Sequence, residues 1–502
     1  MRTLALAAVL AAVLAGCATA PAADPATQPA AQTTAQTARD ALWLDRLTWG
    51  ATGADLAQLR RQGRAAWLDA QLDDGPAARP PALPPLPPLL PLVQQLAAQR
   101  QAADALADGD ARAAARRAYQ QALARLARGA SARTLLHALD SPQQLREQLT
   151  WFWFNHFNVA QAKGDLRAMV GDYEQGLRER ALGRFRDLLG YAVRHPALLR
   201  YLDNERNAAR RLNENHAREL LELHTLGVDG GYGQRDVQAL ARVLTGLGLR
   251  LADGPPRLRP AQQARYWRDG LAEFNPARHD FGAKTLLGQP IRGDGLAEID
   301  HVLDLLARHP ATARHLCAKL ARYFVADEPP PALVARMAER WRRSDGRIAE
   351  VLRTLVASPE FEASLGRKFK DPVHYVVSAV RLAHADRAAL DTAPLLGWLN
   401  RLGQAPHDRA TPDGYPLDEG AWAGPGQMAT RFEVAQAIGS GMPALRRAPG
   451  QRRPAVPQLD TPLYRDAIAP RLAPATRAAL AGAASPQAWN TLLLASPEFM
   501  HR

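Results

Sequence analysis

Signals for the start of a helix recur along this chain of 502 residues. At Ser141-Pro142, a serine that can accept a hydrogen bond from a free backbone N–H stands before a proline that fits the first helical turn. Similar pairs occur at His195-Pro196, His309-Pro310, Ser358-Pro359 and Ser496-Pro497. Because no fixed spacing links these pairs, they predict many separate helices rather than a repeat solenoid.

The rest of the pattern agrees with a helical class. Residues 96–127 contain no proline and consist mainly of Ala, Arg, Gln and Leu, which favours one long helix or two. Residues 80–91 (PPALPPLPPLLP) form a polyproline-type spacer. Alternating patterns are scarce, and only residues 247–284 suggest strands. We therefore predict an all-α, multi-helical body with long Pro/Gly-rich loops and at most a small β-hairpin.

The N-terminus has the features of a secretory signal. Arg2 precedes an apolar run, and that run ends in Leu14-Ala15-Gly16-Cys17. The run is too short to be a transmembrane helix. Its ending resembles the bacterial lipobox, in which the cysteine is acylated and becomes the mature N-terminus. We expect a signal peptide over residues 1–16 and lipidation at Cys17; an ordinary cleaved signal with an incidental cysteine is the alternative.

These features predict a membrane-attached protein of the cell envelope. Ala18, in place of an aspartate after Cys17, favours an outer-membrane lipoprotein. Residues 17–39 are rich in Ala, Thr, Gln and Pro and are expected to be a disordered tether. A helical domain is expected over residues 40–440, and residues 441–502 are expected to be a helical segment that packs on it or continues it.

The charge of the chain does not point to nucleic acid. The net charge is +13, but only five of the 63 basic residues are lysine and the arginines are scattered. No compact basic run is interleaved with aromatics, so we expect no nucleic-acid partner. The motifs of serine hydrolases, nucleotide-binding proteins, zincins, haem proteins and EF-hands are also absent from the sequence.

The most informative stretch for function is residues 213–228. Wound as a helix at about 100° per residue, it places Asn215, Glu219 and Glu222 on one face, with Arg218 at the edge of that face. The opposite face is apolar, which predicts a helix that is largely buried. Buried carboxylates need partners or a chemical role, so this polar face is the leading candidate for a site.

Glu219 and Glu222 are the candidate catalytic carboxylates, and their spacing also suits two ligands of a divalent metal ion. His156, at the end of another predicted helix, is the candidate catalytic histidine; a buried structural histidine is the alternative. His224 lies about 160° around the helix from Glu222. We therefore expect His224 to pack in the core with a ring N–H bonded to a carbonyl, and a Glu-x-x-His metal motif is absent.

Other polar residues are candidates for binding a substrate or a partner. They are Asp203, Asn213, Asn215, Arg218, Asp413 and Tyr415. Each one alone could instead cap a helix or pair with an arginine. Pro412-Asp413-Gly414-Tyr415-Pro416 is expected to be an ordered turn, because Pro-Asp-Gly favours a turn.

With these residues in place, the chain resembles the bacterial domain of unknown function family 1800 (DUF1800). The matching segments, in order, are Arg46–Gly50, Trp153–Val159, Asp172–Glu174, Tyr201–Asn204, Asn213–Val228, His279-Asp280, Lys368–Lys370 and Pro412–Pro416. His216 stands where relatives usually have an aromatic residue, and Leu247 where they usually have tryptophan. The resemblance implies a mostly helical exported protein without an established reaction. It also implies a family 1501 protein, similar to alkaline phosphatases and sulfatases, as a partner.

Two functions remain open from the sequence. The favoured one is a non-catalytic scaffold or export partner in the envelope, in which arginines neutralise the acidic face. The alternative is an envelope hydrolase that uses Glu219, Glu222 and His156, with a divalent metal ion as cofactor. Convergence of these residues with Asp203 in one place would favour the hydrolase, whereas separate ion pairs with arginine would favour the scaffold.

Overall fold

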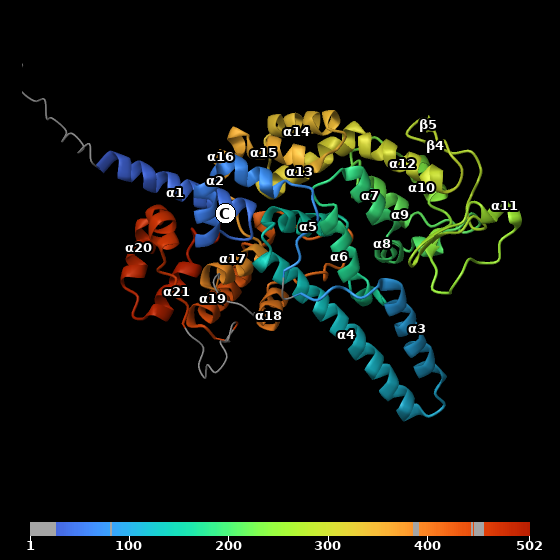
Figure 1. Cartoon of the computed structure of the whole chain (residues 1–502), viewed down its shortest axis with the longest axis horizontal. Coiled ribbons are helices and arrows are strands. Elements are labelled where there is room, and N and C mark those ends of the chain that lie inside the picture. The colour runs from blue at the N-terminus through green and yellow to red at the C-terminus, as the bar shows by residue number, and fades with distance from the viewer. Residues whose placement is uncertain (1–26, 81–82, 385–390, 443–444, 446–455) are drawn as a thin grey trace, which may run out of the picture.

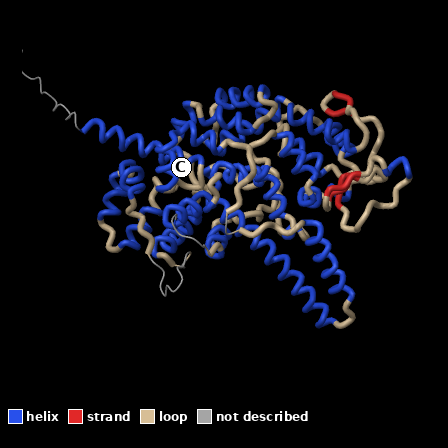
Figure 2. The backbone as a smooth tube through the Cα atoms, viewed as in Figure 1, coloured by secondary structure: helices blue, strands red, loops and turns tan. Residues whose placement is uncertain are grey.

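The computed structural model describes residues 27–80, 83–384, 391–442, 445 and 456–502. Helices dominate it and strands are few (Figures 1 and 2), which confirms the predicted all-α class. The predicted signal peptide and Cys17 lie outside the described residues. Within the described part, no helix is both long and apolar enough to cross a membrane.

The helices fall into three groups along the chain. The N-terminal part contains α1 (Thr27–Leu47), α2 (Gly53–Gln71), α3 (Leu89–Ala105), α4 (Gly109–Asp140) and α5 (Gln144–His156). The central part contains α6 (Val170–Glu179), α7 (Phe185–Arg194), α8 (Pro196–Tyr201), α9 (Asn215–Glu222), α10 (Gln234–Val243) and α11 (Pro260–Gln263). The C-terminal part contains α12 (Leu296–Arg308), α13 (Pro310–Phe324), α14 (Pro331–Arg343), α15 (Ile348–Val356), α16 (Pro359–Ser364), α17 (Pro372–His384), α18 (Ala393–Arg401), α19 (Pro425–Ser440), α20 (Pro474–Ala481) and α21 (Pro486–Leu494). Shorter turns are the 3-10 segments η1 (Leu166–Ala168), η2 (Asn204–Arg206), η3 (Glu419–Ala421) and η5 (Ala469–Arg471), and the π-helical η4 (Tyr464–Ile468).

The β structure is somewhat larger than the hairpin expected from the sequence. Strands β1 (Leu247–Leu249), β3 (Ala272–Phe274) and β2 (Trp267–Asp269) form an antiparallel sheet in that order. A separate pair follows in β4 (Thr285–Leu286) and β5 (Gln289–Pro290). Figure 2 shows all of these strands gathered at one end of the molecule.

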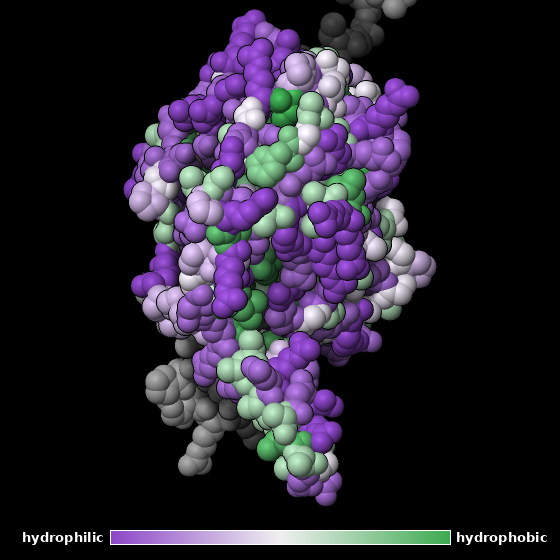
Figure 3. Space-filling model, turned by 90° about the vertical axis from the view of Figure 1, so that its right-hand side faces the viewer, coloured by the Kyte–Doolittle hydropathy of each residue, from purple (hydrophilic) through white to green (hydrophobic). Residues whose placement is uncertain are grey.

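The Ala/Arg-rich run forms two antiparallel helices, α3 and α4, as one of the two sequence alternatives predicted. Asp108 separates them, because its carboxylate accepts hydrogen bonds from the backbone N–H groups of Asp110 and Ala111 and so caps α4. The α3–α4 hairpin projects from the body (Figure 1). On the side shown in Figure 3, hydrophilic side chains dominate and apolar ones form a narrow strip that reaches onto this projection.

Three of the predicted helix starts are correct, one is displaced by two residues and one is wrong. His195, His309 and Ser358 each accept a hydrogen bond from a backbone N–H at the start of α8, α13 and α16. Ser141 lies two residues before the cap of α5. The prediction at Ser496-Pro497 is wrong, because that segment forms turns rather than a helix.

Part of the expected tether is helical. Helix α1 begins at Thr27, so the second half of residues 17–39 is helical rather than disordered. Thr37 in that half is already buried. Further along α1, Trp43 and Leu44 are buried in the core, which explains why the helix is held against the body.

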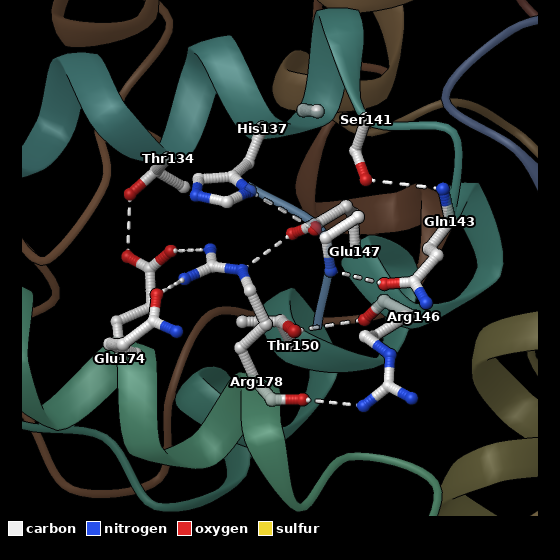
Figure 4. A network of polar contacts seen from close by, with 12 residues as sticks. Thr134, His137, Ser141, Gln143, Arg146, Glu147, Thr150, Glu174 and Arg178 are labelled. Carbon is white, nitrogen blue, oxygen red and sulfur yellow. Dashed lines mark hydrogen bonds and ion pairs between the residues drawn. The ribbon is translucent and has the colours of Figure 1, made fainter. Parts of the chain in front are cut away.

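Helix α5 passes through the middle of the core and is buried on every side. Its Glu147 joins a buried ionic cluster with Glu174 and Arg178 of α6 (Figure 4). Arg178 Nε lies 2.8 Å from Glu147 Oε2, and a second guanidinium nitrogen binds Glu174. His137 Nδ1 of α4 lies 3.2 Å from Glu147, and Thr134 Oγ1 of α4 and His407 Nε2 lie 2.5 and 2.6 Å from Glu174. The cluster therefore ties α4, α5 and α6 together.

Candidate functional site

Helix α9 carries the polar face predicted from the sequence. It is shorter than the predicted stretch, since it ends at Glu222. Ala217, Leu220 and Leu221 are fully buried on the opposite face, as predicted. Glu219 and Glu222 are partly buried. The helix therefore presents two half-buried carboxylates from a firmly packed base.

Glu219 and Glu222 are not neutralised by arginine. Among the described residues, neither carboxylate forms an ion pair with a lysine or an arginine. Burial raises the pKa of Glu219, and the negative charge of Glu222 raises it further. Burial, followed by the negative charge of Glu222, raises the pKa of Tyr232. The two carboxylates are thus electrostatically coupled, as their spacing suggested.

Arg218 points to a different pair of residues. Its guanidinium lies 3.1 Å from the carboxylate of Glu214 and 3.0 Å from the side-chain oxygen of Gln234. It nevertheless lowers the pKa of Glu219 from a distance, against the larger effect of burial.

Asn213 and Asn215, at the start of α9, position a neighbouring turn. Asn215 donates to the carbonyl of Leu202, and Asn213 donates to the carbonyl of Asp203, both at 3.2 Å. Asp203 has a left-handed backbone with φ 58°, which the two bonds help to hold. Its carboxylate forms an ion pair with Lys163 at 2.9 Å. The carboxylate of Asp203 is therefore paired with Lys163 rather than with a side chain of α9.

The predicted turn at residues 412–416 is held by the end of α5. The Asn155 side chain donates to the Tyr415 carbonyl at 3.0 Å and accepts from the Tyr415 N–H at 2.6 Å. Asn158 donates to the carbonyls of Arg409 and Thr411. The Tyr415 hydroxyl donates to the Ala405 carbonyl. Tyr415 is therefore a positioning residue in this structure, and the turn presents Asp413.

Asp413 remains ionised more readily than a free aspartate. Burial alone would raise its pKa, but hydrogen bonds from Thr411 and Arg409 outweigh that effect and lower it. Asp413 in turn raises the pKa of Glu219. It also acts on Tyr201, whose pKa rises to about 12 through burial and through the charges of Asp413 and Glu219. These three side chains therefore share one electrostatic environment.

His156, at the end of α5, contacts Lys319 of α13. His156 Nε2 lies 3.1 Å from the carbonyl of His224 and must donate to it. Nδ1 is then free of hydrogen and accepts from Lys319 Nζ at 3.1 Å. Burial, followed by the charge of Lys319, holds the pKa of His156 well below its ordinary value.

Lys319 is the residue that sequence reasoning missed. Burial lowers the pKa of its amine to about 8, although the nearby charge of Asp413 acts in the opposite direction. The other four lysines, at 163, 284, 368 and 370, each form an ion pair with a carboxylate. Lys319 forms none within the described part of the chain. The signal available in the sequence was the rarity of lysine. In a chain that uses arginine almost everywhere, a lysine offers a basic group that can lose its proton, which arginine cannot do.

Three further histidines surround this point. His224 and His216 are fully buried, and neither ring nitrogen of either residue has a hydrogen-bond partner among the described residues. The core position predicted for His224 is confirmed, but the expected ring hydrogen bond to a carbonyl is not present. His315 is partly buried and its Nε2 contacts the carbonyl of Leu223. Burial lowers the pKa of His216 to about 3 and that of His315 to about 4.

The donors present do not form a complete metal site. In residues 27–502, leaving out the undescribed gaps, no three His, Cys, Asp or Glu side chains are arranged to hold a metal ion. The predicted pair Glu219 and Glu222 would offer two carboxylates, fewer than a divalent cation takes from a protein cage. Proton transfer by the side chains themselves is the chemistry that this arrangement supports.

The fold and these residues define a class: a large helical protein with a half-buried carboxylate, lysine and histidine centre that joins α5, α9, α13 and the turn at residues 412–416. The chain belongs to the family described as "Protein of unknown function (DUF1800)", whose model matches residues 42–501. No curated protein and no solved structure gives a match to the chain. Three of the segments that carry the family resemblance, Trp153–Val159, Asn213–Val228 and Pro412–Pro416, contribute residues to this centre.

Proposed function

We propose that this DUF1800 protein is an outer-membrane lipoprotein of the bacterial envelope and that its carboxylate, lysine and histidine centre makes it a hydrolase. The N-terminal signal pattern and Cys17 support the location. One observation carries the enzymatic part. Two neighbouring carboxyl groups, Glu219 and Asp413, have pKa values displaced in opposite directions beside a lysine without an ion pair among the described residues.

Opposite displacement of two carboxyl pKa values assigns an acid and a base. The raised pKa of Glu219 favours the protonated form, which can give its proton to a leaving-group oxygen. Asp413 stays ionised and can accept a proton from the attacking water. The hydroxide part of that water adds to the substrate while the leaving group departs with the proton from Glu219, so the reaction consumes one water.

Lys319 and His156 have supporting roles in this proposal. With a pKa of about 8, Lys319 is mostly cationic at neutral pH and roughly a tenth neutral. Its charge stabilises the ionised Asp413 and any negative charge that develops beside it. His156 accepts a hydrogen bond from Lys319 Nζ, so it is a positioning residue that fixes the amine.

The test is a hydrolysis screen with the full-length protein and fractionated bacterial envelope material as substrate. Glu219→Gln, Asp413→Asn and Lys319→Met should each lower turnover by about 10²–10⁴-fold, as expected for loss of a general acid, base or charge stabiliser. Glu433→Gln is the matched control, because Glu433 pairs with Arg401 at an exposed surface away from the centre. Absence of turnover in every fraction, or equal turnover in all variants, would contradict the proposal.

A scaffold or export partner is the second candidate, favoured by the projecting α3–α4 hairpin (Figure 1). A family 1501 protein is the partner implied by the family resemblance. Crosslinking from the hairpin tip, at Leu106, should capture this partner in intact envelopes. If the tip captures nothing while crosslinkers on the body do, the hairpin is not the docking element.

A further inference from the structure

We propose that the cleft between the α3–α4 hairpin and the body binds a neutral glycan chain. The inference rests on the proposed function, because it names the substrate class for the same centre. The cleft has a volume of about 780 Å³, within the range of about 300–1,000 Å³ for sites that bind small molecules. The hairpin contributes Arg100, Gln101 and Tyr119, and the body contributes the segments 163–165 and 200–206.

The charges that line the cleft balance. Four cationic side chains, Arg100, Lys163, Arg200 and Arg206, face four acidic ones, Asp104, Asp165, Asp203 and Glu205. A lining of zero net charge does not attract a polymer of either charge. The balanced charge therefore argues against nucleic acid, an anionic lipid headgroup or a strongly charged peptide as the ligand of this cleft.

Most of these charged groups are already fixed by one another. Lys163 binds Asp203 at 2.9 Å, and Arg200 binds both Asp165 and Glu205. Carboxylates held in this way still have free lone pairs, and guanidinium groups still have free N–H groups. The wall is therefore an ordered array of acceptors and donors. Adjacent sugar hydroxyls, each able to donate and accept, match such an array.

The cleft also has an apolar side. Tyr119 and Leu123 of α4 lie along it, with Leu251 from the body. A tyrosine combines an apolar ring face with a polar tip, which suits the C–H face and the hydroxyl edge of a pyranose ring. Gln101 and Gln120 add amide groups that both donate and accept.

One short turn connects the cleft to the acid–base centre. Asp203 lines the cleft, whereas Tyr201, two residues earlier, shares the environment of Glu219 and Asp413. Lys163 Nζ binds the Tyr201 carbonyl at 2.6 Å and lies 5.6 Å above the Tyr201 ring. The cleft and the centre therefore share one short turn, and a polymeric substrate held in the cleft is proposed to extend past this turn to the carboxylates.

The test is binding of chitotetraose, cellotetraose and maltotetraose to the full-length protein in a zwitterionic detergent, measured by calorimetry. At least one tetrasaccharide should bind, and Gln101→Ala should weaken it by about fivefold to tenfold. Gln99→Ala is the matched control, because Gln99 is exposed on the same helix but does not line the cleft. Circular dichroism should show both variants folded.

Glu219→Gln separates this inference from the proposed function, since it should lower turnover by about 10²–10⁴-fold and leave glycan binding unchanged. Binding without any turnover would keep the glycan site and remove the hydrolase. No binding of the three tetrasaccharides at millimolar concentration, or equal binding by Gln101→Ala and Gln99→Ala, would overturn the inference. Preferential binding of an acidic or basic peptide to the cleft would also overturn it.

Discussion

Buried titratable side chains are the most unusual feature of this protein at the scale of single residues. His216 and His224 have no exposed surface and no partner for either ring nitrogen within the described residues. A buried imidazole without a partner is stable only when neutral, and burial accordingly lowers the pKa of both. When the pKa of a histidine is lower in the folded state than in the unfolded state, the histidine does not affect stability at pH values above its unfolded pKa. As the pH falls below the unfolded pKa, the unfolded state binds a proton that the folded state does not, and the free energy of unfolding decreases.

His216→Phe should make the fold less sensitive to acid. With a folded pKa of about 3 and an ordinary value of 6.5, His216 should cost about 2 kcal/mol at pH 5 and almost nothing at pH 7.5. Denaturant unfolding at both pH values measures this. The loss of stability from pH 7.5 to 5 should be smaller in the variant by about that amount. Equal losses in the two proteins would show that His216 does not titrate as described.

Arg178 is the residue on which the buried ionic cluster depends. Burial would raise the pKa of Glu147 and of Glu174, but the charge of Arg178 together with the hydrogen-bonded histidines His137 and His407 lowers both. Arg178→Met should remove the arginine partner of two buried carboxylates, leave each beside a histidine, and reduce the free energy of unfolding by about 3–5 kcal/mol. Arg343→Met, which removes an exposed partner of Glu339, should change it by less than about 0.5 kcal/mol. Similar values for the two variants would contradict the importance of the cluster.

At the scale of elements, the turn at residues 412–416 shows how the centre is assembled. Its position depends on Asn155 and Asn158 at the end of α5, more than 250 residues away in the chain. Gly414 allows the approach: it has φ +78°, and a Cβ there would lie 2.1 Å from the Asn155 carbonyl oxygen. Because that atom belongs to the backbone of a buried helix, it cannot move aside.

Gly414→Ala should therefore destabilise the protein by more than backbone strain alone. Gly403 has a similar φ of +73° with nothing within 4 Å of the added Cβ, so Gly403→Ala should cost only about 1–2 kcal/mol. We expect Gly414→Ala to cost at least about 3 kcal/mol in denaturant unfolding, since the clash adds to the strain. Equal costs would mean that the turn and α5 can separate easily.

At the scale of the whole molecule, the sequence predicted local features better than their meeting point. The helical class, the two helices of the Ala/Arg-rich run and the buried face of α9 follow from periodicity and capping residues. The helix at Thr27 and the turn at Ser496 were missed because packing overrides weak local signals. Lys319 stands in no motif, and its contact with His156 spans 163 residues, so only the tertiary fold could reveal it.

The proposed attachment to the envelope is also a property of the whole chain. Cys17→Ala should remove the acylation site and release the protein from the membrane fraction after cell lysis, whereas wild type should remain with it. Cys317→Ala is the matched control, because Cys317 is buried in α13 and should not affect attachment. Release of wild type, or retention of Cys17→Ala, would contradict a lipid anchor at Cys17.

The titration of Lys319 tests the central claim most directly. Competitive labelling of its amine across the pH range should give a pKa of about 8, well below the ordinary 10.5. Asp413→Asn should lower that pKa further, because the charge of Asp413 raises it in the wild type. An ordinary lysine pKa, or a value that Asp413→Asn leaves unchanged, would show that Lys319 and Asp413 do not form one centre.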